Sequence, residues 1–249
     1  MTTVTRPVGE LLRTWRERRR LSQLELSVQV GVSTRHLSFV ETGRSRPTSN
    51  MILRLSEQLD VPLRERNSLL LAGGYAPAYP DGGLDAPEFE SIRDTLRQVL
   101  AAHEPNPAAV VDRHWNLVDA NESVAMFLDG AAPELLAPPI NVLRLSLHPD
   151  GMAPRIINLQ QWRAHLLGRL RRQAAATGDP VLAELYQELG GLPTAAADPP
   201  GPGDVAVPLR YRHGDAELSF VTITAMFGTP MHVTLAELAI ELFYRQPGG

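Results

Sequence analysis

The chain has 249 residues, 43% of them apolar, and a formal net charge of −4, a size and composition that suit one or two domains with buried cores. It contains no cysteine, which excludes disulfides and thiolate metal sites and makes a reducing cytoplasm the expected location. No apolar run approaches the ~20 residues of a membrane span, and no apolar signal-peptide core is present, so we expect no membrane association.

The charge is distributed unevenly along the chain. Residues 1–74 hold 12 Arg against 7 acidic residues, a net charge of +5, whereas residues 75–249 hold 12 Arg against 21 acidic residues, a net charge of −9. A basic head on an acidic body indicates that any contact with nucleic acid is confined to the head.

Residues 1–74 are predicted to form an all-α domain of five short helices. The first helix has apolar residues at i, i+3, i+4 and i+7, which are Val8, Leu11, Leu12 and Trp15. Ser22 and Glu25 have the spacing of a capping box, which begins the second helix. Gly31 is the residue type that tolerates the left-handed conformation at a helix end, so the second helix should stop there.

Three more helices complete the predicted domain. Ser33 is placed to cap the third helix, in which Leu37 and Val40 face the core. A fourth helix is expected to start at Thr48 or Ser49, and Pro62 suits the first turn of a fifth, which runs to residues 73–74. The second and third helices, joined by a glycine turn, have the layout of a helix-turn-helix.

In a helix-turn-helix the second helix enters the major groove of DNA, and its N-terminal residues lie nearest the base edges. We expect base contacts from Thr34, Arg35, Ser38 and Phe39. Arg35 can donate two hydrogen bonds to guanine, and Phe39 can touch a thymine methyl if it is exposed. The alternative for Phe39 is packing against a neighbouring helix.

Contacts to the DNA backbone are expected around the predicted recognition helix. These contacts are assigned to Gln23, Ser33, Arg44 and Arg46. The alternative for both arginines is a solvated loop charge.

Residues 8–73 resemble the Xre-type, lambda-repressor-like helix-turn-helix family. The resemblance rests on LSQ-x-EL at residues 21–26, GVS at residues 31–33 and E-x-G-x-x-x-P at residues 41–47. It implies that an arginine of the first helix pairs with the glutamate that ends the recognition helix. The matching residues are Arg16 and Glu41, so we interpret this pair as structural.

Residues 75–87 are rich in Pro and Gly and are predicted to be a linker to a second domain at residues 88–249. That domain is expected to begin with a helix over residues 88–103 and two strands near residues 107–112 and 115–119. A helical middle follows, with helices at residues 121–128, 155–176 and 180–189 and an irregular connection at residues 190–204. Three antiparallel strands close the chain near residues 205–212, 218–227 and 238–244. This order is compatible with an α+β fold, a five-stranded antiparallel sheet with helices on one face.

The second domain resembles the MmyB-like ligand-binding domain of bacterial regulators. The matching stretches are VDRHWNLVDAN at residues 111–121, NVLRLSLHPDG at residues 141–151 and FGTP-x-x-VTLAEL at residues 227–238. The resemblance implies a PAS-like fold and a bound apolar ligand, for which a fatty acid is one choice. The run Pro149-Asp150-Gly151 is interpreted as a tight turn.

A ligand in such a fold would lie between the sheet and the helices. Its predicted pocket consists of Trp115, Phe127, Leu143, Leu147, Trp162, Leu166, Phe220, Ile223, Met226, Arg144 and His148. Arg144 and His148, with Arg155 and Arg169 as further choices, would serve a ligand carboxylate. Ordinary core packing is the alternative for the apolar members, and a surface charge is the alternative for the arginines and the histidine.

These patterns predict a DNA-binding transcription regulator that acts as a homodimer on a double-stranded operator and is controlled by a small-molecule effector. The alternative is a second domain that serves only for dimerisation. No G-x-S-x-G, G-x-x-x-x-G-K, Rossmann or H-E-x-x-H motif occurs, so we expect no enzyme activity, no metal and no cofactor.

Overall fold

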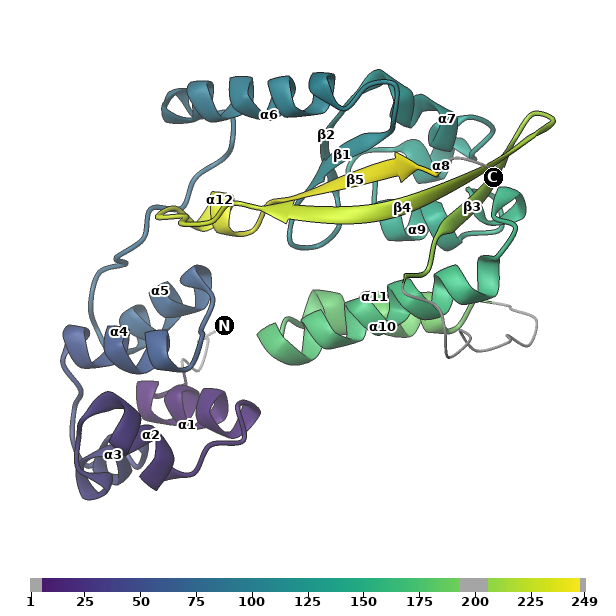
Figure 1. The fold of residues 1–249 in the computed structure, drawn as a ribbon. Helices are drawn as coiled ribbons and strands as arrows, with labels where there is room; N and C mark the ends of the chain where they lie inside the picture. The colour runs from purple at the N-terminus through teal and green to yellow at the C-terminus, as the bar shows by residue number, and fades with distance from the viewer. Residues whose placement is uncertain (1–5, 193–205, 247–249) are drawn as a thin grey trace. The chain divides into compact units, whose positions relative to one another are not determined.

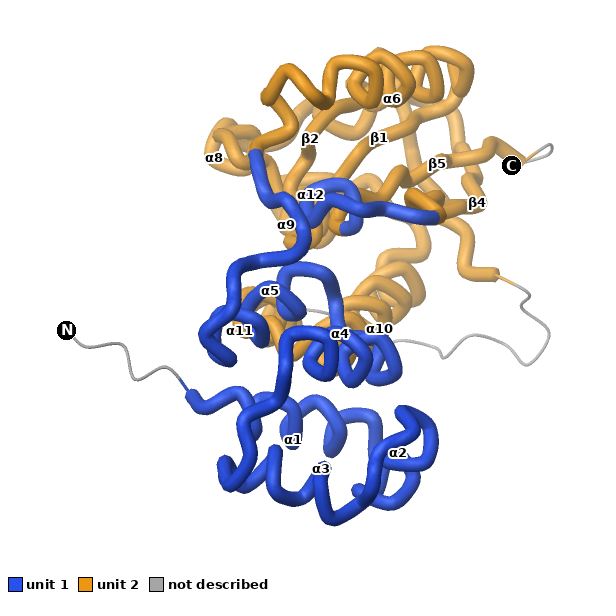
Figure 2. The backbone as a smooth tube through the Cα atoms, turned by 90° about the vertical axis from the view of Figure 1, so that its left-hand side faces the viewer, with its two compact units in different colours: residues 1–82, 229–236 blue, residues 83–228, 237–249 orange. Residues whose placement is uncertain are grey.

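The computed structural model describes residues 6–192 and 206–246, which divide into two compact units. Unit 1 comprises residues up to 82 together with residues 229–236, and unit 2 comprises residues 83–228 and 237–249 (Figure 2). The predicted boundaries, 1–74 and 88–249 with a linker between them, differ from these units at two places. Residues 75–82 pack with unit 1, and so does a segment between the last two strands.

Unit 1 is a helical domain, as predicted (Figure 1). Its helices are α1 Val8–Arg18, α2 Gln23–Val30, α3 Thr34–Glu41, α4 Ser49–Gln58, α5 Leu63–Ala72 and α12 Val233–Ala236. The core gathers the apolar stripe of each helix, with Leu37, Ile52 and Leu55 wholly buried. Because a stripe of this kind can leave water only against other helices, the five N-terminal helices form one core.

Residues 75–82 and 229–236 are joined to the middle of α5 and to each other by hydrogen bonds. Asn67 on α5 accepts from the backbone N–H groups of Ala78 and Tyr79 at 3.0 and 3.1 Å, and its amide donates to the Tyr79 carbonyl at 2.7 Å. The N–H of Val233, a fully buried residue, donates to the Pro80 carbonyl at 3.0 Å. The hydroxyl of Thr234 donates to the Gly82 carbonyl. Residues 75–82, which belong to the predicted linker, are therefore part of unit 1.

Unit 2 is built on a five-stranded antiparallel sheet in the order β2-β1-β5-β4-β3, which confirms the predicted sheet. Its strands are β1 Ala108–Val111, β2 Leu117–Ala120, β3 Leu209–His213, β4 Ala216–Met226 and β5 Ala239–Arg245. Its helices are the 3-10 turn η1 Pro87–Phe89, α6 Glu90–Ala102, η2 Glu122–Val124, α7 Ala125–Leu128, α8 Pro133–Leu136, α9 Val142–Leu147, η3 Ala153–Arg155, α10 Leu159–Thr177 and α11 Pro180–Gly190. Helices α8, α9 and α12 were not predicted.

Helices cover both faces of this sheet, where the sequence predicted one. Successive side chains of a strand point to opposite faces, and all four residues of β1 are nevertheless buried. Ala109 and Val111 face the core shared with α9 and α10, while Ala108 and Val110 face the side on which α6 packs (Figure 1). The predicted connection at residues 190–204 lies almost wholly outside the described residues.

Candidate DNA-binding surface and ligand cavity

The helix-turn-helix geometry of unit 1 is set by local sequence. The Ser22 hydroxyl accepts from the Glu25 N–H at 3.1 Å and the Glu25 carboxylate accepts from the Ser22 N–H at 2.7 Å, which confirms the capping box. Gly31 ends α2 with φ of 72°, the left-handed conformation that the turn requires. Gly9 lets α1 approach α3, because a Cβ there would lie 2.1 Å from the Val40 carbonyl oxygen.

The predicted pair of Arg16 and Glu41 is confirmed as a buried ion pair. The Arg16 guanidinium donates to both Glu41 carboxylate oxygens at 2.7 and 2.9 Å and to the Leu21 carbonyl at 2.8 Å. The hydrogen bonds to Glu41 raise the pKa of Arg16 above its ordinary value, although burial acts in the other direction. The pair fixes the end of α3 to α1, so it belongs to the scaffold.

Gln23 is part of the same network. Its amide donates to the Glu41 carboxylate at 2.8 Å, and the side chain is half-buried. This contact occupies a donor that was predicted to reach a DNA phosphate.

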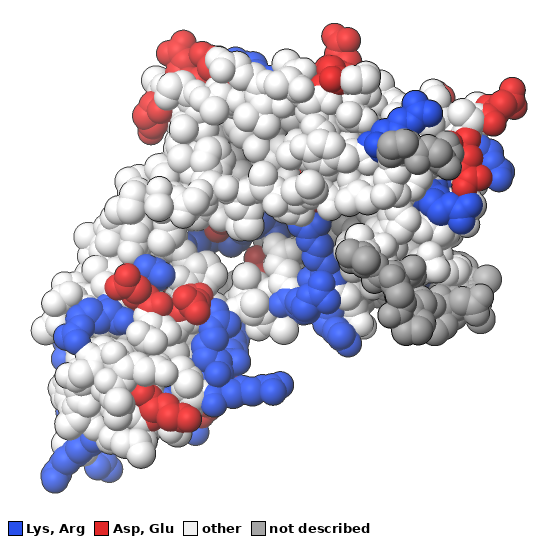
Figure 3. All heavy atoms as spheres, viewed as in Figure 1, with Lys and Arg blue, Asp and Glu red and all other residues white. Residues whose placement is uncertain are grey.

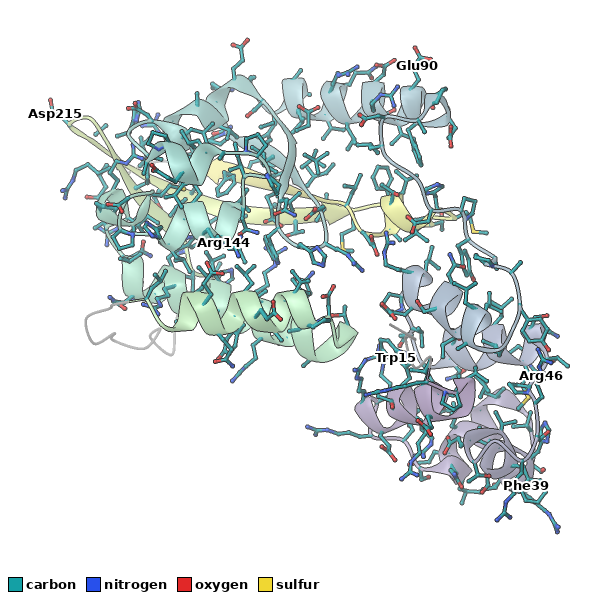
Figure 4. All side chains as sticks on the ribbon, turned by 180° about the vertical axis from the view of Figure 1, so that it is seen from behind. Trp15, Phe39, Arg46, Glu90, Arg144 and Asp215 are labelled. Carbon is teal, nitrogen blue, oxygen red and sulfur yellow. The ribbon has the colours of Figure 1, made fainter. Side chains whose placement is uncertain are left out.

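Three side chains form an exposed basic surface at α3, which we call the Arg35–Phe39–Arg44 surface. The guanidinium carbons of Arg35 and Arg44 lie 5.3 and 5.9 Å from the centre of the Phe39 ring, one on α3 and the other in the loop after it. Both arginines are exposed, and Phe39 is half-buried. Figure 4 shows Phe39 at the lower tip of unit 1, and Figure 3 shows arginine atoms projecting from that tip. Phe39 therefore packs against cations of its own helix and loop.

The other predicted DNA contacts are placed differently. Ser33 caps α3 by accepting from the His36 N–H at 3.1 Å, and the Thr34 hydroxyl lies 2.8 Å from that of Ser27. Ser38 is half-buried on α3. His36, in the first turn of α3, is exposed and was not predicted, although its place beside Arg35 is a signal that could have found it.

Arg46 is exposed, but its guanidinium is held by a backbone carbonyl of the domain. Its guanidinium donates twice to the Gly73 carbonyl, at 2.8 and 3.3 Å, and lies 5.6 Å from the centre of the Tyr75 ring. Figure 4 shows Arg46 away from Phe39. The end of α5 thus uses the hydrogen-bonding capacity that the sequence had assigned to a phosphate.

Unit 2 contains an apolar cavity of about 80 Å³ between the sheet and the helices. Five of the predicted pocket residues line it: Trp115, Phe127, Leu143, Trp162 and Leu166. Leu147 and Phe220 are buried in the surrounding core without lining the cavity. The structure therefore brings about half of the predicted pocket together.

Two predicted pocket residues, Ile223 and Met226, lie outside the cavity lining. Their side chains are 50% and 69% exposed. Residues alternate along β4, so Ile223 points away from the face that carries Phe220 and Thr222. Met226 is the last residue of β4 and lies beyond the core.

The predicted cations Arg144 and His148 are also outside the cavity lining. Arg144 of α9 forms a bidentate ion pair with Glu188 of α11, and both N–O distances are 2.7 Å (Figure 4). This pair raises the pKa of Arg144 and lowers the pKa of Glu188. The Nδ1 atom of His148 lies 3.7 Å from the Oδ2 atom of Asp150. The inward face of α9, a helix that the sequence did not predict, instead carries Leu143, Leu145 and Ser146.

The VDRHWNLVDAN stretch builds a turn that presents Trp115 to the cavity. The Asp112 carboxylate accepts from the backbone N–H groups of His114 and Asn116, each at 2.8 Å. Trp115 itself has φ of 68°, an unusual value for a bulky residue, and its indole N–H donates to Gln173 at 2.8 Å. The motif is thus structural, because the turn that it forms orients the Trp115 ring.

The NVLRLSLHPDG stretch folds as α9 followed by the predicted tight turn. Gly151 approaches the preceding helix so closely that a Cβ would lie 2.2 Å from the Leu145 carbonyl oxygen. Ser146 of α9 accepts from the Trp162 indole N–H at 3.0 Å, which fixes a second aromatic ring of the cavity.

The cavity also has polar lining residues that the sequence analysis did not select. They are Ser146, His165, Thr222 and Glu241, and they join Arg169, which was considered only as a further cation. Arg169 binds both oxygens of Glu241 at 2.7 and 3.0 Å, and its guanidinium carbon lies 4.5 Å from the centre of the Trp115 ring. Glu241 was missed because an alternating strand pattern does not show which face meets the core.

Within residues 6–192 and 206–246, no three His, Asp or Glu side chains cluster as metal ligands would. In the same residues, no helix is both long enough and apolar enough to span a membrane.

The two units thus combine a helix-turn-helix with a sheet domain that encloses an apolar cavity, the construction of a DNA-binding protein with a ligand domain. Residues 92–246 match the MmyB-like transcription regulator ligand binding domain, and residues 12–66 match a helix-turn-helix model. The first match covers more than half of the chain, so the chain belongs to the MmyB-like family of transcription regulators.

Two curated relatives agree with this assignment. A putative HTH-type transcriptional regulatory protein of Methanoculleus marisnigri is 33% identical over 111 residues, 43% of this chain and 35% of the relative. The uncharacterized HTH-type transcriptional regulator RghRB of Bacillus subtilis is 34% identical over 104 residues, 40% of this chain and 73% of the relative. The chain spans about a third of the first relative's length and about three quarters of the second's.

Proposed function

We propose that this protein is a sequence-specific DNA-binding regulator of transcription that inserts α3 into the major groove. The observation that carries the proposal is the exposed Arg35–Phe39–Arg44 surface on a helix-turn-helix with a confirmed scaffold. Arg35 occupies the first turn of α3, the part of a recognition helix that lies nearest the bases. A basic unit on an acidic chain directs DNA to this surface.

The proposed DNA contacts depend on whether each side chain is exposed or already hydrogen-bonded within the protein. Arg35 reads a base, because its exposed guanidinium can reach guanine O6 and N7 together. Arg44 neutralises a phosphate from the loop after α3. Thr34, Ser38 and Phe39 complete the base-facing side of α3, and Ser33 offers a further backbone contact. Gln23 and Arg46 contribute less than the sequence suggested, since protein groups already bind them.

Paired substitutions separate base reading from charge neutralisation. DNA selected from a random library by the full chain supplies the operator, and binding of each variant is then measured on it and on single-base changes. Arg35→Ala should lose about 1–3 kcal/mol of discrimination at one base position. Arg44→Ala should weaken binding on all sequences alike and reduce the salt slope by about one. A uniform loss for Arg35→Ala, with discrimination intact at every position, contradicts the assignment.

The second part of the proposal is that a small, largely apolar molecule in the unit 2 cavity controls DNA binding. Trp115, Phe127 and Trp162 give the cavity an aromatic wall, while Thr222, His165 and Arg169 give it a few polar groups. This mixture is typical of small-molecule sites. The family resemblance suggests a fatty acid as one such ligand.

The chain path supplies a route from the cavity to the DNA-binding unit. Thr222 of β4 and Glu241 of β5 line the cavity, and residues 229–236 between these strands belong to unit 1. A shift of either strand is therefore transmitted to residues 229–236, which are hydrogen-bonded to residues 80 and 82. In this proposal the protein is a cytoplasmic homodimer with two arrangements of its DNA-binding units. The effector controls DNA binding because it has a different affinity for each arrangement.

Ligand sensing can be tested by denaturing extraction of the purified full chain, followed by mass spectrometry. A small apolar molecule at one per chain, whose addition changes operator affinity, supports the proposal. Repeated absence, with no thermal shift across a panel of lipids and metabolites, favours a second domain that serves only for dimerisation.

A further inference from the structure

Arg169, an arginine that lines the unit 2 cavity, is already neutralised by a carboxylate of the protein. Arg169 donates to both oxygens of Glu241, at 2.7 and 3.0 Å, and to the Thr224 hydroxyl at 2.8 Å. The Glu241 side chain is 9% exposed, and that of Arg169 is 26% exposed. A ligand carboxylate would have to displace Glu241, which would leave a buried negative charge without its partner.

The remaining titratable group of the lining adds no positive charge. His165 is half-buried and its ring stacks on Trp162, with the ring centres 5.6 Å apart. Burial, followed by the neighbouring charges of Arg169 and Arg172, lowers the pKa of His165, while Glu241 acts in the opposite direction. The lowered pKa favours the neutral imidazole, and the charged lining residues Arg169 and Glu241 form an ion pair with each other.

One hydroxyl of the lining, that of Thr222, lacks a partner in residues 6–192 and 206–246. The Thr222 Oγ1 atom is buried and makes no hydrogen bond within the part of the chain that the structure describes. Thr222 shares the inward face of β4 with Phe220, and its neighbour across the sheet is Phe243. A buried hydroxyl without a partner is costly, and a hydroxyl can both donate and accept. A ligand with one neutral polar group would satisfy it.

The size of the cavity limits the ligand. Its volume of about 80 Å³ is several times what one water needs. It is smaller than the ~150 Å³ of an engineered apolar cavity that binds benzene. A small ring or short chain fits after a modest adjustment, whereas a long acyl chain needs the core to open.

We propose that the cavity selects a small uncharged molecule that carries one hydroxyl or carbonyl group bonded to Thr222, and that it rejects carboxylates. This inference rests on the proposed ligand-sensing function and narrows the class of ligand: an uncharged molecule takes the place of the fatty acid that the family resemblance suggests. Glu241 is the residue that sets the charge selectivity, because it neutralises Arg169 before any ligand arrives.

Three probes of similar size test the proposal on the full chain: benzyl alcohol, toluene and benzoate. Binding is measured by calorimetric titration and by the shift in melting temperature. Benzyl alcohol should bind at least about tenfold more tightly than toluene, the factor of one hydrogen bond to a buried group. Benzoate should give no binding at the same concentrations.

Two variants locate the effect. Thr222→Val keeps the side-chain shape and should reduce benzyl alcohol to the affinity of toluene, with toluene unchanged. Glu241→Gln removes the counter-charge of Arg169 and should allow benzoate to bind. If circular dichroism shows that Glu241→Gln is unfolded, the comparison of Thr222→Val with the unaltered chain decides the proposal.

Several results would overturn the proposal. They are benzoate binding to the unaltered chain as tightly as benzyl alcohol, equal binding of toluene and benzyl alcohol, and no binding of any probe. The first two results leave ligand sensing itself in place, because a molecule still enters the cavity. The extraction experiment tests sensing separately, so failure of the ligand class and failure of the function are distinguishable.

Discussion

The charge on Glu41 should be a large single contribution to the stability of unit 1. Glu41→Gln keeps the size of the side chain and removes its charge. The Arg16 guanidinium, whose side chain is 10% exposed, is then left buried against a neutral amide. Three donors converge on the carboxylate, two from Arg16 at 2.7 and 2.9 Å and one from Gln23 at 2.8 Å.

The magnitude follows from the burial of the pair. Breaking a buried ion pair by removing one partner costs about 3–5 kcal/mol, a large part of the stability of a small domain. Hydrogen exchange followed by mass spectrometry measures this loss in each unit of the full chain separately. Protection of α1 and α3 amides should fall at least about a hundredfold, since each 1.4 kcal/mol is about a factor of ten. Peptides from β1, β4 and β5 should keep their protection.

A matched control is available on α1, the helix that carries Arg16. Glu17 pairs with Arg13 at 2.7 Å, but their side chains are 53% and 60% exposed. Glu17→Gln should therefore change protection by less than about 1 kcal/mol. The double variant Arg16→Met with Glu41→Leu should recover most of the stability, because no buried charge remains. If Glu41→Gln costs no more than Glu17→Gln, the reasoning about burial is refuted.

Three further predictions concern local structure. Gly151→Ala should lower the melting temperature of unit 2, because its Cβ would lie 2.2 Å from the Leu145 carbonyl oxygen; an unchanged transition would contradict that packing. Ser22→Ala should destabilise unit 1 by about 1 kcal/mol in denaturant titrations, with little effect if α2 does not depend on its cap. Burial acts to raise the pKa of Asp179, but hydrogen bonds, the largest with His114, bring it below its ordinary value. Asp179 should therefore add stability above about pH 4 that is lost as the pH falls through its folded pKa, and Asp179→Asn should remove that part of the acid dependence.

Much of unit 1 could be predicted from the sequence because its signals are local. A capping box, a glycine at a helix end and an apolar stripe act within a few residues, so Ser22, Gly31 and Leu37 have the predicted roles. The pairing of Arg16 with Glu41 joins distant residues, and it came from the family resemblance. The partners of Gln23 and Arg46 could not be predicted, because they depend on how α2 and α5 pack.

The cavity of unit 2 was less accessible to sequence reasoning. Trp115, in the turn before β2, and Trp162, on α10, were selected and do line the cavity, because large apolar side chains are buried wherever they lie. Strand alternation shows two faces without saying which one meets the core, so Ile223 was placed inward and Glu241 was overlooked.

The sequence by itself therefore determined the helix-turn-helix, the positions of the five strands along the chain and the separation of a basic head from an acidic body. These features follow from short-range periodicity and composition. Only the tertiary structure decided that Arg169 meets Glu241, that the Thr222 hydroxyl has no partner among the described residues and that residues 229–236 join unit 1. Each of these depends on contacts between segments far apart in the chain, which the packing of the sheet and its helices creates.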